Sequence, residues 1–247
     1  MHILNSLDEW RFSINASNIY LNISNSLSTP INNCPETNFL TSLNETGSSD
    51  SNDDISSLLK SQRINYPKKI IIGHLNINSI RNKFVLLQEI VESNLDIFLI
   101  TESKIDDSFP NSQFSIPDYR LFRKDRNVNG GGLLLYVNQN IPGKIINSFF
   151  FEFEILAFEF SVANKKWLLL GIYKPPSVNE EAFFREIIAA LNSYSSDYEN
   201  FILMGDFNAT TENHHLKDLL NTFAFDSLIK EPTCFKSTTP TCIDLIL

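Results

Sequence analysis

Short apolar runs alternate with amphipathic stretches over the larger, second part of the chain. Residues 70–78 and 96–101 are rich in β-branched and aliphatic side chains, and each run ends in polar residues, as buried strands do. Between these runs Phe84, Leu87 and Val91 recur at spacings of three and four, which predicts a helix with one buried face. Strand, helix and strand therefore form the first predicted unit.

Further apolar segments follow at 145–151, 155–162 and 167–173, close enough together to be antiparallel neighbours. Ser177-Val178-Asn179-Glu180 has the Ser-x-x-Glu form of a capping box, and apolar residues at 183–191 mark one face of the helix after it. The last predicted elements are a buried strand at 201–206, a short helix at 216–222, and a strand at 243–247 that stops in mid-run.

Three glycines, residues 130–132, precede the apolar run 133–137. A glycine-rich loop can cradle a phosphate, but this one lacks the Lys-Ser/Thr ending of a P-loop and precedes a strand instead of a helix. We interpret the triplet as a structural entry into a strand.

Composition changes sharply along the chain. Residues 1–68 contain 11 Asn and 13 Ser, which favour turns and solvated chain over packing. With 43% hydrophobic residues over 247 positions, the remainder is sufficient for one substantial core. We predict a disordered Asn/Ser-rich arm over 1–68 and one domain over 69–247.

Targeting and redox signals are weak. No apolar run approaches the length of a membrane span, and the first residues form no basic leader. Cys34, Cys234 and Cys242 are odd in number and lack a Cys-x-x-Cys spacing, which argues against a structural disulfide or a zinc site. We expect a soluble intracellular monomer without a membrane partner, in either nucleus or cytoplasm.

The formal net charge of −9 disfavours general binding to nucleic acid, because phosphate contacts come mostly from Lys and Arg. A hydrolase that holds a divalent cation nevertheless needs acidic residues at its centre. Arg120, Arg123, Lys124 and Arg126 fall within seven residues. A solvated loop is the default interpretation of a single basic cluster. Contact with a phosphate backbone is the alternative.

Polar residues suited to phosphate chemistry stand at four predicted strand ends: Asn76, Glu102, Asp206 with Asn208, and Asp244. Each alone is more often a cap or turn residue. Strand ends at one edge of a sheet converge, however, and sites in layered α/β folds are commonly assembled there.

Phosphodiester hydrolysis requires these residue types. Magnesium prefers oxygen ligands and keeps several waters, so one or two carboxylates suffice. An in-line water needs a group that orients or deprotonates it, for which Asp206 is suited. Asn208, Asn76 and the phenol of Tyr173 can stabilise the charge that builds on the phosphoryl oxygens.

Five short motifs, taken together and in this order, carry a family resemblance. They are Leu75-Asn76-Ile77-Asn78, Thr101-Glu102-Ser103, Gly171-Ile172-Tyr173, Gly205-Asp206-Phe207-Asn208 and Cys242-Ile243-Asp244-Leu245. With them the sequence resembles the endonuclease/exonuclease/phosphatase superfamily over about residues 69–247. Asp-Arg-x-x-x-Gly-Gly-Gly and Tyr-Lys-Pro-Pro make it most similar to the endonuclease domain that precedes reverse transcriptase in non-LTR retrotransposons. The resemblance implies a four-layered α/β sandwich of two mostly antiparallel β-sheets flanked by helices, with the last strand or strands missing.

The resemblance also implies roles for single residues. Glu102 would be the principal ligand of Mg²⁺, or of Mn²⁺ in its place, with Asn76 beside it. Asn78 stands where relatives outside the retrotransposon branch often have Asp. Tyr173 would contact the scissile phosphate, and Asp206 would position or deprotonate water. The further implied roles are phosphate binding by Asn208, substrate contact by Thr233 and Arg126, and orientation of a catalytic histidine by Asp244.

That catalytic histidine belongs to a Ser-Asp-His segment in the family, which this sequence lacks. His2 lies in the arm, His74 is expected to be a core or strand-end histidine, and His214 and His215 are expected to open a surface helix. We therefore expect a weakly active or inactive chain that is less stable than a complete domain.

Three functions remain open at this point. The first is a magnesium-dependent phosphodiester hydrolase that acts on DNA, with a reverse-transcriptase domain as partner in the full-length relative. The second is a catalytically dead remnant that binds nucleic acid. The third is a phosphatase of the same fold that acts on a phosphomonoester or a lipid head group.

Overall fold

Strands and helices follow one another largely as the hydrophobic pattern predicts. The computed structural model describes residues 59–92, 94–146, 153–229, 233–234 and 241–247. The elements are β1 (Ile72–Asn76), α3 (Phe84–Val91), β2 (Ile97–Thr101), the 3-10 helix η1 (Asn111–Phe114), β3 (Tyr119–Lys124), β4 (Leu133–Asn138), β5 (Gly143–Ile146), β6 (Glu154–Val162), β7 (Lys165–Tyr173), α4 (Glu180–Tyr194), β8 (Asn200–Asp206), α5 (His214–Phe223) and β9 (Asp244–Ile246).

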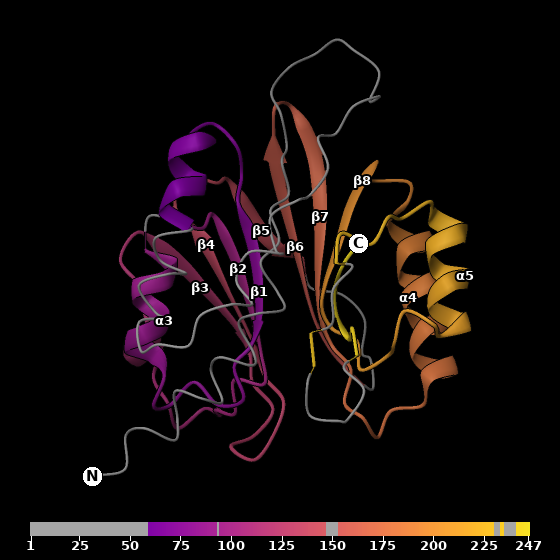
Figure 1. Cartoon of the computed structure of the whole chain (residues 1–247), viewed down its shortest axis with the longest axis horizontal. Coiled ribbons are helices and arrows are strands. Elements are labelled where there is room, and N and C mark those ends of the chain that lie inside the picture. Colours follow the sequence, from indigo (N-terminus) through magenta and orange to yellow (C-terminus); the bar gives the residue numbers. More distant parts are fainter. Residues whose placement is uncertain (1–58, 93, 147–152, 230–232, 235–240) are drawn as a thin grey trace, which may run out of the picture.

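Two β-sheets lie face to face in the centre of the molecule (Figure 1). Within the described ranges the first has the strand order β1-β2-β4-β3 and the second β5-β6-β7-β8-β9. The pairs β1–β2 and β7–β8 are parallel, and all other neighbouring strands are antiparallel. Both parallel pairs bring strand C-termini to a common edge, which is the edge where the candidate site forms.

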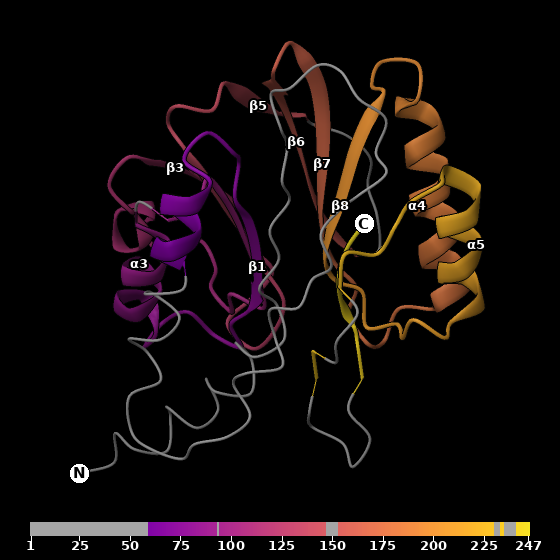
Figure 2. The same cartoon turned by 45° about the horizontal axis from the view of Figure 1, so that its top comes forward.

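Helices cover the two outer faces, so that the fold has the four layers expected from the sequence. Helix α3 lies outside the first sheet, and α4 and α5 lie outside the second, as Figures 1 and 2 both show. Three apolar clusters fill the spaces between layers. The cluster between the sheets contains Leu99, Leu135, Leu169, Met204 and Ile246, all of them buried.

Both helices on the second sheet begin with an asparagine cap. The Asn179 side chain accepts a hydrogen bond from the Ala182 amide at 3.0 Å, so α4 starts later than the Ser177 capping box predicted. The Asn213 side chain caps α5 in the same way through the Leu216 amide. Helix α5 opens at His214, as expected for the histidine pair.

The expected arm over residues 1–68 falls mostly outside the described residues. Its final part contradicts the prediction of disorder, because residues 59–65 are helical and Leu59 is 5% exposed within the first core cluster. Arg63 also bonds the Asp96 carboxylate at 2.5 Å. The packed part of the chain therefore includes residue 59 and begins before the predicted boundary.

None of the helices in the described ranges combines the length and the apolar composition that a membrane span requires.

Candidate active site

One row of polar residues crosses the second sheet at the site edge. Glu154 pairs with Tyr173, Tyr173 with Asp206, and Asp206 with Asp244. Side chains at directly paired positions lie on the same face of a sheet. This face also carries apolar residues of the inter-sheet cluster, so all four polar side chains face the first sheet.

Asn76 connects this row to the first sheet. Its Nδ2 donates to Glu102 Oε1 at 3.1 Å and to Asp206 Oδ2 at 3.0 Å, although Asp206 is 130 positions away in the sequence. The other Asp206 oxygen, Oδ1, accepts from the Asn208 amide at 3.0 Å. Asp206 is only 1% exposed, so these donors hold a buried carboxylate in a defined orientation.

Glu102 reaches the site from a turn that directly follows β2. Glu102 and Lys104 both have positive φ, 53° and 54°, a backbone conformation that is uncommon for non-glycine residues. Main-chain bonds hold the turn, from Ser103 N to Gly132 O at 3.2 Å and from Lys104 N to Gly131 O at 3.0 Å. The glycine triplet thus supports the Glu102 turn as well as opening β4.

A lysine stands beside the proposed metal ligands. Lys104 Nζ lies 3.1 Å from Glu102 Oε2 and also donates to Asn78 Oδ1. The backbone N–H of Asn78 in turn donates to Asn76 Oδ1 at 3.1 Å. The three predicted metal ligands are therefore linked by hydrogen bonds. The ammonium group of Lys104 lies against the carboxylate of Glu102, which is the one carboxylate among them.

The chemistry of this donor set fits a hard divalent cation. Glu102, Asn76 and Asn78 offer carboxylate and amide oxygens, which Mg²⁺ and Mn²⁺ accept, and Mg²⁺ retains several waters in such sites. The described residues contain no group of three or more His, Cys, Asp or Glu that could hold a metal.

Asp244 lies at the far end of the row, next to a buried histidine. His74 Nδ1 is 3.8 Å from Asp244 Oδ1, and His74 Nε2 is 3.2 Å from Thr101 Oγ1. Burial lowers the pKa of His74 to about 3, so its imidazole is neutral at working pH. The prediction of a core histidine at this position is confirmed.

Thr233 supports Asp244 through the main chain. Its Oγ1 accepts from the amides of Ile243 and Asp244, each at 3.0 Å, and the residue is 5% exposed. Contact between Thr233 and substrate stays a prediction.

Tyr173 lies between the carboxylates of the row. Burial, together with the charges of Glu102, Asp206 and Glu154, raises the pKa of the Tyr173 phenol above its ordinary value. The hydroxyl therefore keeps its proton at neutral pH and can donate a hydrogen bond to a phosphate oxygen.

The basic cluster has a different role from the solvated loop that the sequence suggested. Arg120, Arg123 and Lys124 lie on β3, at one edge of the first sheet. Arg120 donates to the carbonyl oxygens of Ile141 and Gly143 and lies over the rings of two phenylalanines. Arg120 is therefore engaged in packing the two sheets together.

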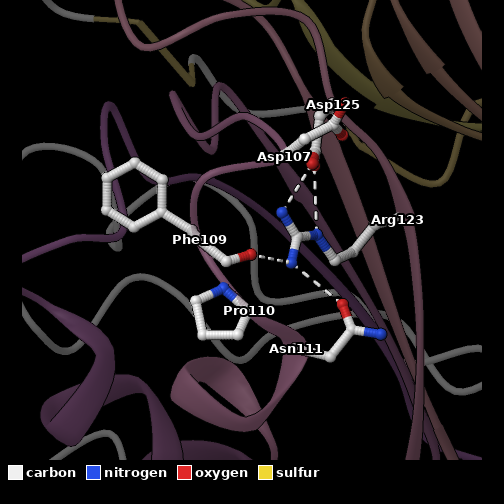
Figure 3. Close-up of a pocket in the computed structure, with 6 residues that line it drawn as sticks. All are labelled: Asp107, Phe109, Pro110, Asn111, Arg123 and Asp125. Atoms are coloured by element: carbon white, nitrogen blue, oxygen red, sulfur yellow. Dashed lines mark hydrogen bonds and ion pairs between the residues drawn. The ribbon is translucent and has the colours of Figure 1, made fainter.

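Arg123 lines a surface pocket together with Asp107, Phe109, Pro110, Asn111 and Asp125 (Figure 3). Its guanidinium donates to both Asp125 oxygens, to Asn111 Oδ1 and to the carbonyls of Asp106 and Phe109. These bonds use all five of its N–H groups. Of the cluster, Lys124 and Arg126 are left to meet a phosphate.

The structure gathers most of the predicted site residues at this edge, whereas Arg120 and Arg123 of the basic cluster lie elsewhere. The gathered residues are Asn76, Asn78, Glu102, Tyr173, Asp206, Asn208, Thr233 and Asp244, with Arg126 beside Glu154. Two further participants were missed, Glu154 and Lys104. A charged residue on the inward side of the apolar strand 154–162 was a usable signal for Glu154, because buried carboxylates need partners. Lys104 has no comparable signal, because its proximity to Asn78 depends on the positive-φ turn.

Two mixed sheets between helices, with carboxylate and amide side chains gathered at one edge, define a four-layered α/β fold with a polar site. The model of the endonuclease/exonuclease/phosphatase family matches residues 73–247, and the chain belongs to this family. Enzymes of this family generally use divalent metals, and nuclease and phosphatase activities both occur in it. No curated protein sequence matches the chain.

Solved structures agree on the fold. The endonuclease domain of TRAS1, a telomere-specific non-LTR retrotransposon, has a TM-score of 0.54 and 15% identity, with 71% of this chain and 82% of that one covered. The 3′ phosphatase NExo from Neisseria, bound to a product DNA hairpin, gives 0.51 and 13%, covering 71% and 84%. The human Nocturnin catalytic domain gives 0.50 and 17%, covering 67% and 73%.

Proposed function

We propose that the chain is a divalent-metal-dependent phosphodiester hydrolase that acts on DNA, in the manner of a retrotransposon endonuclease. The observation that carries the proposal is the double hydrogen bond of Asn76, which joins Glu102 of the first sheet to Asp206 of the second. It places a potential metal ligand and a potential base on either side of one amide, which is what a site for in-line attack on phosphorus requires.

Glu102, Asn76 and Asn78 would hold Mg²⁺ or Mn²⁺. A cation bound there would offset the negative charge that builds on the phosphoryl oxygens. Lys104 would give up part of its contact with Glu102 and move toward the substrate phosphate.

Asp206 accepts a proton from the attacking water in this proposal. Asn76 donates to one of its oxygens and the backbone N–H of Asn208 to the other, so the carboxylate has a defined orientation toward the water. The water oxygen bonds to phosphorus as the ester oxygen departs, and Tyr173 donates a hydrogen bond to a non-bridging oxygen. Asp244, held by Thr233, completes the row beside Asp206.

The departing oxygen needs a proton as well. His74 is the histidine that lies against Asp244 in the described part of the chain, and as a buried neutral imidazole it is a poor proton donor. Protonation by solvent alone would make turnover slow, since a positioned acid contributes about 10²–10⁴-fold.

DNA is the proposed substrate for two reasons. Among the similar folds, one is a retrotransposon endonuclease domain and another was solved with a product DNA hairpin. In addition, Arg126 keeps 41% of its side chain exposed beside the row, where a backbone phosphate could meet it.

The test compares nicking of supercoiled plasmid with phosphate release from small monoesters, in Mg²⁺, Mn²⁺ and EDTA. We expect slow nicking that EDTA abolishes, and no monoester hydrolysis. Preferential monoester hydrolysis would replace this proposal with a phosphatase. Tight DNA binding without nicking would indicate a catalytically inactive binding module, which the Lys104–Glu102 contact and the neutral His74 favour as the second candidate.

A further inference from the structure

Glu154 is a buried carboxylate at one end of the polar row. It opens β6 directly opposite Tyr173, and it is 7% exposed. Its Oε2 accepts from the Gly132 amide at 2.5 Å, and its Oε1 lies 3.4 Å from Arg126 Nη1. Burial raises the pKa of this carboxyl, while the Gly132 amide and Arg126 act against that shift. A buried charge carries a desolvation cost, so the groups that contact Glu154 indicate its role.

The glycine loop is shaped around this carboxylate. Gly131 has φ +70°, and a Cβ there would lie 2.4 Å from Glu154 Oε1 and 2.6 Å from the Arg126 side chain. The carbonyl oxygens of the same loop accept hydrogen bonds from the backbone N–H groups of Ser103 and Lys104, and these bonds hold the Glu102 turn. Glu154 therefore joins the second sheet to the loop that supports the metal-binding turn of the first.

Arg126 is the more exposed partner in this pair. Its side chain is 41% exposed, against 9% for the side chain of Glu154. Within the described part of the chain its guanidinium makes one hydrogen bond, to Glu154, whereas Arg123 uses all five donors. Four N–H groups therefore remain for a ligand on the solvent side, in the fork geometry that suits a phosphate.

We propose that Glu154 is a positioning residue, which holds the Arg126 guanidinium beside Tyr173 so that the free N–H groups of Arg126 bind a backbone phosphate of the substrate. The identity of the ligand as DNA rests on the proposed function. The geometric part, a carboxylate that orients a phosphate-binding arginine, does not require that the chain cleave anything.

The direction in which DNA affinity changes when Glu154 is substituted separates this role from simple charge repulsion. Removal of a negative charge next to DNA strengthens binding if the charge only repels phosphate. If Glu154 positions Arg126, Glu154→Gln weakens binding instead, because Gln can still accept from the Gly132 amide but cannot hold the guanidinium by charge. In an Arg126→Ala background the same substitution loses this effect.

The experiment measures Kd for a short DNA duplex in EDTA, so that no cleavage occurs, with wild type, Glu154→Gln, Arg126→Ala and the double variant. We expect each single variant to bind about tenfold more weakly, and the double variant to bind within about twofold of Arg126→Ala. Glu159→Gln is the matched control, because Glu159 lies on the same strand and pairs with Lys144 and Lys166 instead. It is expected to bind no more weakly than wild type.

Three results would overturn the proposal: tighter binding by Glu154→Gln, additive effects in the double variant, or wild-type binding no stronger than that of Arg126→Ala. Glu154→Asp, which withdraws the carboxylate by one methylene, serves if Glu154→Gln does not fold, and it is expected to weaken binding as well. Loss of nicking with an intact binding cycle would reject the proposed function alone. Nicking with a failed cycle would reject only the role of Glu154.

Discussion

Gly205 provides the sharpest test of the geometry at the site. It precedes Asp206 on β8, has φ +141°, and pairs with Ile172 of β7. A Cβ at this position would lie 1.9 Å from the Ile172 carbonyl oxygen and 2.8 Å from its carbonyl carbon. These are backbone atoms of the neighbouring strand, so no side-chain movement relieves the contact. Gly205→Ala must therefore shift β8 relative to β7.

The cost follows from two contributions. A non-glycine residue in a sparsely populated backbone region costs about 1–3 kcal/mol. Displacement of the strand adds at least one weakened ladder bond, at about 1 kcal/mol. A total of about 3 kcal/mol lowers the melting temperature by about 6–12 °C in a domain of this size.

Thermal unfolding followed by circular dichroism measures this loss. Gly130→Ala is the matched control, because a Cβ at Gly130 meets nothing within 4 Å, and we expect it to melt within about 2 °C of wild type. A Gly205→Ala variant that melts as wild type does would refute the close approach of β8 to β7.

Three further predictions concern His74, Arg123 and Thr233. The pKa of His74 falls from 6.5 to about 3 on folding, so the unfolded chain binds the proton first and stability declines below about pH 6.5. The free energy of unfolding, measured with urea, should fall by about 1.4 kcal/mol between pH 7.5 and 5.5 because of this residue, and His74→Gln should lack that decrease. Equal decreases in both proteins would contradict the lowered pKa of His74. Arg123→Ala removes the donors that hold residues 106–111, so limited proteolysis should cut this loop faster than in an exposed control, Arg185→Ala; unchanged cleavage would count against the pocket. Thr233→Val leaves two amides without their acceptor and should cost about 2 kcal/mol, whereas Thr233→Ser should cost less than about 1; a reversed order would exclude the hydroxyl as the support of Asp244.

The elements easiest to predict from the sequence were those with the most uniform environments. Strands β2 and β8 are buried on both faces, so their apolar runs were unambiguous. Strand β3 was missed because Arg120, Arg123 and Lys124 lie along it, and a strand with basic, half-buried residues resembles a polar loop. Several of the acceptors of its arginines are carbonyl oxygens 14–23 positions away in the sequence, which no local pattern reveals.

The residues of the site also differ in how well the sequence predicts them. Residue types at strand ends predicted Asn76, Glu102 and Asp206, because parallel strands deliver their C-terminal residues to one edge. The register that sets Glu154 opposite Tyr173 depends on pairing between β6 and β7, and the sequence offered only the presence of a buried acid. The contact of Lys104 with Asn78 depends on two positive φ angles and could be found only in three dimensions.

Asp206, fixed by Asn76 and Asn208, is proposed as the base of a metal-dependent phosphodiester hydrolase. The most direct measurement is the rate constant of the first nick in supercoiled DNA with Mg²⁺, for wild type, Asp206→Asn and the exposed control Asp197→Asn. We predict slow nicking by wild type and by the control, and a rate lower by about 10²-fold or more for Asp206→Asn. Equal rates for wild type and Asp206→Asn, or folded wild type that does not nick at all, would contradict the claim.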